Sequence, residues 1–319
     1  MPKLVIEREM IEPGRAFFRE AGRGAAVVCI HSSASSSAQW RALMDRLAGR
    51  FRTLAVDLYG SGKSPMWPDD RPLCLADEAA LLAPVFAAAG ERFHLVGHSY
   101  GGAVALAAAL AEPGRVESLV LFEPVLFSVL IAEDPTQPAA REIAAVRDDT
   151  VAALESGNPR ASGARFVDYW MGAGTWAAMP EPRREALATA MSTVKAEWDA
   201  AFREPTPLSA FAALDVPVLY ITGSDSPASS RGVARLLTRT LPRVTAVEIE
   251  GVGHMGPVTH PDRVNGLIER YLTDGPATPT EQTRRNGHGQ CDPDEHPLGG
   301  DAEAFRRPGS GLRPGQPVL

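Results

Sequence analysis

Phe93-His-Leu-Val-Gly-His-Ser99-Tyr-Gly-Gly102 is the most informative stretch of this 319-residue sequence. The apolar run that starts it predicts a buried strand, and the alanine-rich run that follows it predicts a helix. Between them, Gly97-His98-Ser99-Tyr100-Gly101 has the pattern Gly-x-Ser-x-Gly, in which a serine occupies a tight strand-to-helix turn. Small residues on both sides leave room for that turn, which lifts the serine hydroxyl clear of the sheet. Ser99 is therefore the predicted nucleophile.

Composition limits the classes of protein to which this chain can belong. Apolar residues make up 45% of the chain, charged residues make up 22%, and the formal net charge is −7. The length predicts one large core, and the acidic balance argues against partners such as nucleic acid or an anionic membrane. No apolar run approaches a membrane span, and no leader is expected. We expect a cytoplasmic monomer or homodimer whose partner is a small-molecule substrate.

The cysteines do not indicate a disulfide framework or a metal site. They are odd in number and widely spaced: Cys29, Cys74 and Cys291. The C-terminal tail also holds residue types that bind metals, without a ligand spacing: His288, Cys291, Asp292, Asp294 and His296. We therefore expect no metal and no organic cofactor.

The order of the predicted elements is typical of an α/β fold with a mostly parallel, doubly wound sheet. Continuous apolar runs predict further buried strands at 25–30, 51–58, 116–122, 216–222 and 244–250. Helices are expected between them, including a single helix from Cys74 to Ala89. Reactive groups are expected at the carboxyl ends of the strands, where the loops leave the sheet.

The alternation of strand and helix ends at Val125 and resumes after Leu208. The intervening segment is helix-forming and rich in tryptophan, methionine and proline. We interpret 125–208 as a helical lid inserted between two parts of the core, 1–124 and 209–273. From 274 to 319 the chain is rich in glycine, proline and charge, which predicts a disordered tail.

Four local motifs, in this order, resemble those of the α/β-hydrolase superfamily. They are His31-Ser32-Ser33 with Trp40 downstream, Asp57-x-x-Gly60-x-Gly62-x-Ser64, the turn from Gly97 to Gly101, and Gly251-x-Gly253-His254. The resemblance covers roughly 17–272 and implies an α/β-hydrolase core with an inserted helical cap. It also implies a serine hydrolase in which His254 is the base, in the chain order nucleophile, acid, histidine.

The third catalytic group is open between two carboxylates. A serine hydroxyl needs an imidazole to take its proton, and the imidazole needs an acid to hold its tautomer. Related enzymes usually place that acid at the position of Ser226; Asp225 is one residue earlier, and Glu123 ends the preceding core strand. For the oxyanion, the resemblance implies the backbone N–H groups of Tyr100 and Ser33. Ser32 stands where the family usually has glycine.

Other residues are given lesser roles. We interpret Trp40, Trp67, Phe127 and Met255, together with Tyr100, as candidate walls of an apolar pocket beneath the lid. His31, His98 and Asp57 are expected to be structural. Gly62-Lys63-Ser64 is similar to the end of a phosphate-binding loop, but Asp57 stands where that loop needs its first glycine. Haloalkane dehalogenases and epoxide hydrolases carry a carboxylate at the elbow, so Ser99 argues against both.

The predicted function is the cleavage of a small-to-medium ester, lactone or related acyl substrate through an acyl-enzyme on Ser99. Two classes of alternative stay open. The same fold serves C–C bond hydrolases and perhydrolases, and it also serves ligand-binding proteins without catalysis. Substrate identity depends on the lid, about which the motifs say least.

Overall fold

The computed structural model of the protein describes residues 5–6, 16–68 and 70–275. Nearly all of the predicted tail lies outside these residues, as do its possible metal ligands from His288 to His296. Among the described residues, no group of histidine, cysteine and acidic side chains could hold a metal ion. None of the described helices is long and apolar enough to cross a membrane.

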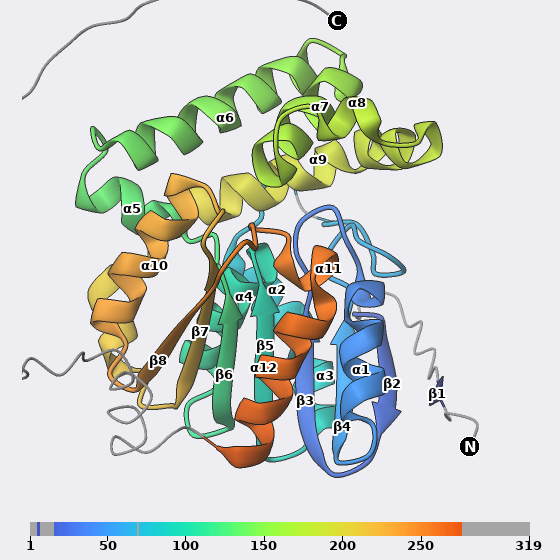
Figure 1. Ribbon diagram of the computed structural model, residues 1–319, viewed down its shortest axis with the longest axis vertical. Coiled ribbons are helices and arrows are strands. Elements are labelled where there is room, and N and C mark those ends of the chain that lie inside the picture. The colour runs from blue at the N-terminus through green and yellow to red at the C-terminus, as the bar shows by residue number, and fades with distance from the viewer. Residues whose placement is uncertain (1–4, 7–15, 69, 276–319) are drawn as a thin grey trace, which may run out of the picture. The chain divides into compact units, whose positions relative to one another are not determined.

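In the part of the chain that the structure describes, eight strands form one sheet. They are β1 (Val5–Ile6), β2 (Phe18–Gly22), β3 (Ala25–Ile30), β4 (Phe51–Val56), β5 (Phe93–His98), β6 (Val116–Phe122), β7 (Val218–Gly223) and β8 (Val244–Ile249). Their order in the sheet is β1-β2-β4-β3-β5-β6-β7-β8 (Figure 1). The pairings of β2 with β1 and with β4 are antiparallel, and all other described pairings are parallel. The predicted mostly parallel sheet is therefore confirmed.

Helices cover both faces of the sheet because side chains alternate along each strand. On β3, Val27 and Cys29 face one hydrophobic cluster, whereas Val28 and Ile30 face the other. The first cluster includes residues of η1 (Ser37–Trp40), α1 (Arg41–Leu47) and α12 (Pro261–Asp274). The second is larger and includes residues of α4 (Tyr100–Ala111) and α10 (Ala228–Thr240).

The helix predicted from Cys74 to Ala89 is in fact two helices. They are α2 (Leu75–Leu81) and α3 (Ala83–Ala89), with the break at Leu82. Pro84 explains the break, because proline has no N–H to donate to the carbonyl four residues earlier and its ring clashes with that carbonyl inside a continuous helix. Pro84 instead lies in the first turn of α3, where a missing donor costs nothing.

The segment between β6 and β7 is a helical insertion, as predicted. It contains α5 (Phe127–Glu133), α6 (Pro138–Glu155), α7 (Pro159–Met171), α8 (Thr175–Ala178) and α9 (Glu181–Arg203), followed by η2 (Leu208–Ala213). Figure 1 shows α6 to α9 lying across the end of the sheet at which β5 and β6 terminate. Polar contacts between this lid and the core include Tyr169 Oη, which lies 2.7 Å from Ser229 Oγ, and Thr193 Oγ1, which donates to the Gly60 carbonyl at 3.4 Å.

Candidate active site

Ser99 occupies a strained turn between β5 and α4. Its φ of 56° and ψ of −119° lie outside the regions that residues with a side chain usually adopt. The turn is possible because of its glycines. A Cβ atom on Gly97 would overlap the backbone of Gly101 and Gly102, and one on Gly101 would overlap the carbonyl oxygens of Ile30 and His31. The predicted strand-to-helix geometry is therefore present at Ser99.

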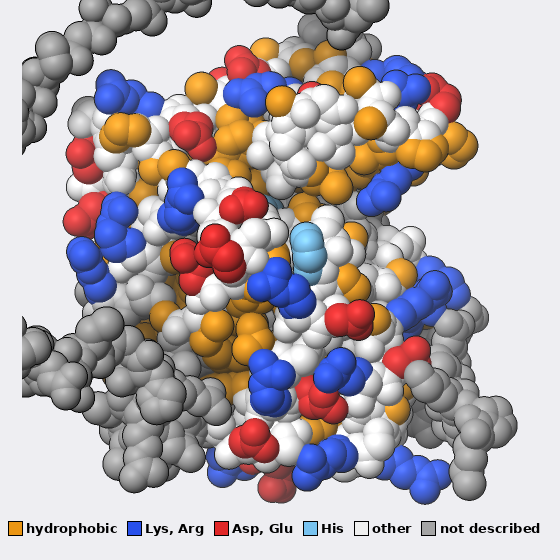
Figure 2. Space-filling view, viewed as in Figure 1, with side chains coloured by type: hydrophobic (Ala, Val, Ile, Leu, Met, Phe, Trp, Pro, Cys, Tyr) orange, Lys and Arg blue, Asp and Glu red, His pale blue; other side chains and the backbone are white. Residues whose placement is uncertain are grey.

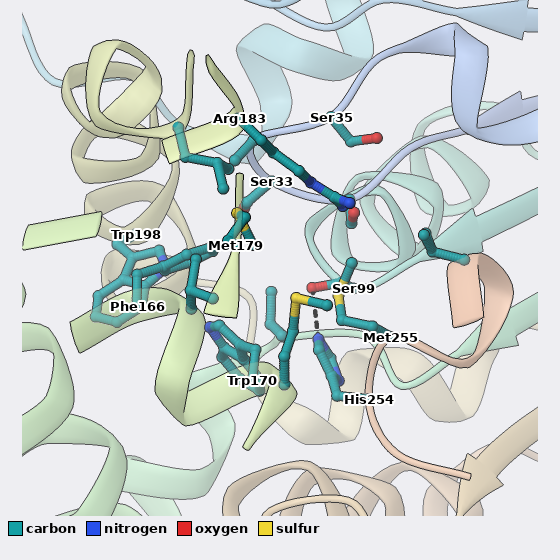
Figure 3. Close-up of a pocket in the computed structure, with 17 residues that line it drawn as sticks. Ser33, Ser35, Ser99, Phe166, Trp170, Met179, Arg183, Trp198, His254 and Met255 are labelled. Atoms are coloured by element: carbon teal, nitrogen blue, oxygen red, sulfur yellow. Dashed lines mark hydrogen bonds between the residues drawn. The ribbon is translucent and has the colours of Figure 1, made fainter. Parts of the chain in front are cut away.

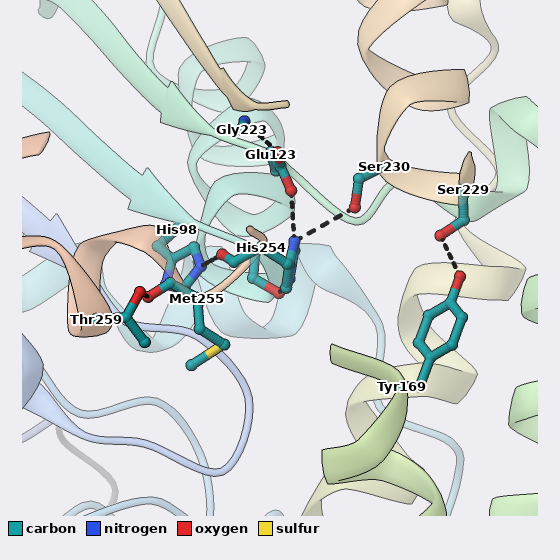
Figure 4. Close-up of polar contacts among 10 residues, drawn as sticks. His98, Glu123, Tyr169, Gly223, Ser229, Ser230, His254, Met255 and Thr259 are labelled. Atoms are coloured by element: carbon teal, nitrogen blue, oxygen red, sulfur yellow. Dashed lines mark hydrogen bonds and ion pairs between the residues drawn. The ribbon is translucent and has the colours of Figure 1, made fainter. Parts of the chain in front are cut away.

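Three side chains from distant parts of the chain form a hydrogen-bonded row (Figures 3 and 4). His254 Nε2 lies 2.9 Å from Ser99 Oγ, and His254 Nδ1 lies 2.7 Å from Glu123 Oε2. All three residues are buried, and His254 is 1% exposed. Because a carboxylate accepts hydrogen bonds, the His254 Nδ1–H donates to Glu123, which leaves Nε2 free to accept the proton of the Ser99 hydroxyl.

Both the backbone and the carboxylate of Glu123 are held in place. Its backbone has a φ of 44° at the turn that follows β6, and its other carboxylate oxygen accepts the Gly223 N–H at 2.7 Å. Backbone hydrogen bonds also join this turn to the nucleophile. The Ser99 N–H donates to the Phe122 carbonyl at 2.9 Å, and the Val125 N–H donates to the Ser99 carbonyl at 3.2 Å. The two turns thus form one backbone unit.

Asp225, the other candidate acid, does not contact His254. Its side chain is exposed and accepts a hydrogen bond from the neighbouring Ser224 hydroxyl at 2.9 Å. The turn after β7 instead contributes Gly223, and the following helix contributes Ser230, whose Oγ lies 3.3 Å from His254 Nδ1. Of the two carboxylates left open by the sequence, the geometry favours Glu123.

The loop after β3 is linked to the His254 loop through two side chains. The Ser32 N–H and hydroxyl both donate to Gln39 Oε1, at 3.2 and 2.9 Å. Gln39 Nε2 donates to His98 Nδ1 at 3.1 Å, and His98 Nε2–H donates to the His254 carbonyl at 2.9 Å. Burial lowers the pKa of His98 well below its ordinary value, which keeps this ring neutral. A neutral ring can accept a hydrogen bond at Nδ1 and donate one from Nε2. Ser32 is thus an anchor for the loop.

The two residues expected to supply oxyanion donors both adjoin Ser99. Ser33 lines the same pocket as Ser99. Tyr100 is the first residue of α4, and the first N–H groups of a helix have no carbonyl partner within it. The Tyr100 side chain does not line the pocket; it is fully buried, with its hydroxyl 3.4 Å from Glu78 Oε1.

His31 and Asp57 have structural contacts. The Leu58 N–H donates to His31 Nε2 at 3.1 Å, and His31 Nδ1–H donates to the Ser32 carbonyl at 2.7 Å. Asp57 accepts hydrogen bonds from the backbone of Ser37 at 2.6 Å and of Lys63 at 2.8 Å. These contacts fix the loops that follow β3 and β4.

A pocket opens from Ser99 toward the lid. Its walls are largely apolar and include Phe166, Trp170, Met179, Leu187, Trp198 and Met255 (Figure 3). On the face shown in Figure 2, hydrophobic side chains of the lid lie above an indentation between the lid and the core. An apolar pocket with a few polar groups at one point is the usual form of a small-molecule site.

Of the five side chains predicted to line this pocket, Met255 does so and the other four do not. Phe127 is fully buried behind the wall, where its ring stacks on Trp170 with 6.3 Å between centroids. Trp40 packs into the core cluster beneath α1. Trp67 packs edge-on against Tyr59, with 5.1 Å between centroids, and donates to the Arg71 carbonyl. Sequence proximity to a motif did not reveal which way these rings face.

Two of the site residues that the sequence reasoning missed bear directly on its chemistry. The Trp170 ring covers the imidazole of His254, with 4.1 Å between ring centroids. Arg183, in the first turn of α9, lines the pocket as well. Trp170 belongs to an amphipathic helix that the sequence indicates only as part of a lid. Arg183 belongs to a charged stretch that resembles any solvated helix surface.

The parallel sheet, the turn at Ser99 and the helical insertion together define the α/β-hydrolase fold. Residues 27–267 match the model of the alpha/beta hydrolase family, and because this match spans most of the chain, the protein belongs to that family. A curated relative is the pimeloyl-[acyl-carrier protein] methyl ester esterase of Aeromonas hydrophila subsp. hydrophila. It is 28% identical over 271 residues, which are 79% of this chain and 96% of the relative.

Solved structures agree with this assignment. An alpha/beta hydrolase from Sphaerobacter thermophilus is similar with a TM-score of 0.64 at 26% identity, over 81% of this chain and 96% of that one. A thermophilic esterase from Thermogutta terrifontis has a TM-score of 0.65 at 24% identity, over 82% of this chain and 94% of that one. At 24% identity, the similarity to the Thermogutta terrifontis esterase shows a shared fold only.

Proposed function

We propose that this α/β hydrolase is a serine esterase that cleaves a small-to-medium carboxylic ester or related acyl compound. One observation carries the proposal: the row of contacts from Ser99 Oγ to His254 at 2.9 Å and from His254 to Glu123 at 2.7 Å. A nucleophile, a base and an acid at hydrogen-bond distance are what acyl transfer by a serine requires. The apolar pocket beside Ser99 suits a substrate with a hydrocarbon body.

In the first half-reaction, Ser99 Oγ attacks the ester carbonyl carbon while its proton passes to His254 Nε2. Glu123 stabilises the imidazolium that forms. The negative charge on the carbonyl oxygen is stabilised by the N–H groups of Tyr100 and Ser33, and one such donor contributes roughly 3 kcal/mol. The tetrahedral intermediate then collapses, the C–O bond to the alcohol breaks, and His254 gives its proton to the leaving oxygen.

In the second half-reaction, a water molecule attacks the acyl-enzyme. His254 Nε2 removes a proton from that water as its oxygen bonds to the acyl carbon. Collapse of this second intermediate breaks the bond to Ser99 Oγ, which recovers its proton from His254. The acid product leaves, and the chain's own side chains carry out every proton transfer.

The ester class is supported by the relatives as well as by the pocket. The Aeromonas hydrophila relative, which aligns over most of both chains, is named as a methyl ester esterase. C–C bond hydrolysis and perhydrolysis use the same kind of serine and histidine. Cleavage of a C–C bond is therefore included among the outcomes of the test.

The test is turnover of p-nitrophenyl acetate and butyrate by the protein and by Ser99→Ala, with labelling by a fluorophosphonate probe. We expect hydrolysis by the native chain, loss of at least about three orders of magnitude in the variant, and probe labelling at Ser99. Labelling without ester turnover, combined with cleavage of diketones, would assign C–C hydrolysis instead. A chain that neither labels nor turns over any ester would be a ligand-binding protein.

A further inference from the structure

Arg183 differs from its neighbours in having no acidic partner among the described residues. Arg160 forms ion pairs with Glu181 at 2.6 Å and Glu185 at 2.7 Å, and Arg184 pairs with Glu181 at 2.6 Å. The acidic side chains around the start of α9 are therefore paired with other arginines. The guanidinium of Arg183 keeps its hydrogen-bond donors available to a ligand.

The position of Arg183 makes that availability relevant to the site. Its side chain lines the pocket that contains Ser99, and Figure 3 shows it extending from the lid, with its guanidinium end drawn between Ser35 and Ser99. Among the described residues that line the pocket there is no aspartate, glutamate or lysine, so Arg183 supplies the one permanent charge. The other walls near it are apolar or carry serine hydroxyls.

We propose that Arg183 is the binding site for a carboxylate on the substrate, so that the preferred substrates are esters with an apolar body and a second, free carboxylate group. This inference rests on the proposed esterase function and names its substrate class. The guanidinium presents paired donors that match the two oxygens of a carboxylate. A single arginine balances one negative charge, whereas a phosphate monoester would leave a second charge uncompensated.

The charge of the whole protein strengthens the argument. With a formal net charge of −7, the chain repels an anionic substrate in general, so recognition of such a substrate needs a local positive group. The apolar body has its own place: Phe166, Trp170 and Trp198 line the pocket beside Ser99. The reacting carbonyl would then lie between an apolar wall and a cation, which fixes the direction in which the substrate enters.

The test compares matched pairs of esters that differ only in one charge. On the acyl side the pair is monomethyl adipate and methyl adipamate, in which an amide replaces the free carboxylate. On the alcohol side the pair is para-carboxyphenyl butyrate and para-carbamoylphenyl butyrate. For each pair, the measured quantity is the ratio of kcat/KM for the charged ester to that for the neutral ester, in the native chain, Arg183→Met and Arg184→Met.

We expect the native ratio to favour the charged ester in one of the two pairs. That ratio should fall roughly fivefold to tenfold in Arg183→Met, since Arg183 is exposed and its charge is partly screened. The matched control Arg184→Met, which removes a neighbouring arginine that is paired with Glu181, should keep the native ratio. High salt should lower the native ratio and leave that of Arg183→Met unchanged. Equal ratios in the native chain and Arg183→Met, in both pairs, would overturn the proposal.

A binding measurement separates this inference from the esterase proposal. Monomethyl adipate is titrated calorimetrically into Ser99→Ala and into the double variant with Arg183→Met. Tighter binding of monomethyl adipate to Ser99→Ala than to the double variant supports the carboxylate site even if no ester is hydrolysed. Equal binding by the two variants, together with hydrolysis of neutral esters by the native chain, contradicts the carboxylate site and leaves the esterase intact.

Discussion

The carboxylate of Glu123 and the N–H of Gly223 are joined by a hydrogen bond of 2.7 Å between residues that are 100 positions apart. Glu123 directly follows β6 and Gly223 ends β7, and these two strands are neighbours in the sheet. The bond orients one carboxylate oxygen toward the sheet, so the other points to His254 (Figure 4). The end of β7 therefore contributes to the candidate site by positioning the acid of β6 rather than by carrying an acid itself.

This arrangement predicts opposite results for two conservative substitutions. Glu123→Gln should lower kcat by about three to four orders of magnitude, because the amide can donate to His254 Nδ1 and favour the tautomer that cannot take the Ser99 proton. Asp225→Asn should stay within about twofold of the native kcat, since the exposed Asp225 contacts Ser224 and not His254. The measurement is steady-state hydrolysis of p-nitrophenyl butyrate. A large loss in Asp225→Asn, with Glu123→Gln active, would reverse the assignment.

Gly101 should be intolerant of any side chain. Its Cβ position would overlap the carbonyl oxygens of Ile30 and His31, so Gly101→Ala should cost about 2 kcal/mol or more in the free energy of unfolding. Gly49 is the matched control, because a Cβ there has no atom within 4 Å; Gly49→Ala should change that free energy by less than about 1 kcal/mol. Urea unfolding measures both. Equal midpoints for Gly101→Ala and the native chain would mean that the turn at Ser99 has more room than described.

Trp170 should contribute to turnover through its cover over His254. Its ring lies 4.1 Å from the imidazole, centroid to centroid, and forms part of the pocket wall. Trp170→Ala should lower kcat/KM for butyrate esters by about tenfold, which corresponds to roughly 1.4 kcal/mol of lost apolar contact. Trp176→Ala removes another indole of the lid that does not line the pocket, and it should change kcat/KM by less than about twofold. Similar losses in both variants would indicate a general loosening of the lid.

Glu197 should make the stability of the protein depend on pH. This glutamate of α9 is fully buried, and neither of its carboxylate oxygens has a hydrogen-bond partner of good geometry among the described residues. Burial raises its pKa from 4.5 to about 8, against a smaller opposite effect of the Ser33 hydroxyl. The folded state then holds a proton that the unfolded state releases. The contribution of Glu197 to stability is therefore greatest below about pH 4.5 and is lost as the pH rises through about 8.

The test of this pH dependence is urea unfolding between about pH 5 and about pH 9. Glu197→Gln should reduce the loss of stability across that range, because glutamine cannot ionise. Part of the loss should persist, since burial also raises the pKa of Glu78, which interacts with Glu197. Glu185→Gln, an exposed position on the same helix, should retain the native slope. An unchanged slope in Glu197→Gln would show that Glu197 is not the group responsible.

The features that could be predicted from the sequence are those set by local backbone geometry. The turn at Ser99 needs glycine at Gly97 and Gly101, so the pattern appears within a few residues. The same holds for the strands, whose apolar runs are continuous because both faces are buried. The choice between Glu123 and Asp225 could not be made in this way. It depends on how the ends of β6 and β7 face a loop that lies 131 residues beyond Glu123.

The pocket could not be predicted for a related physical reason. An aromatic residue near a motif can pack on either face of the sheet or against its own loop, as Trp40 and Trp67 do. Arg183 lies in a charged and proline-rich run at the start of α9, and its significance comes from a lack of acidic partners among the described residues. Such a lack is visible only when the neighbouring side chains are placed.

The backbone hydrogen bonds between the Ser99 turn and the end of β6 limit how such a protein can change. Ser99 donates to Phe122, one residue before the acid, and accepts from Val125, two residues after it. Because these backbone hydrogen bonds join the two turns, a change in the turn that carries Glu123 should also shift the backbone at Ser99. Substitutions in the lid are free of that constraint, so new substrate preferences should arise there first.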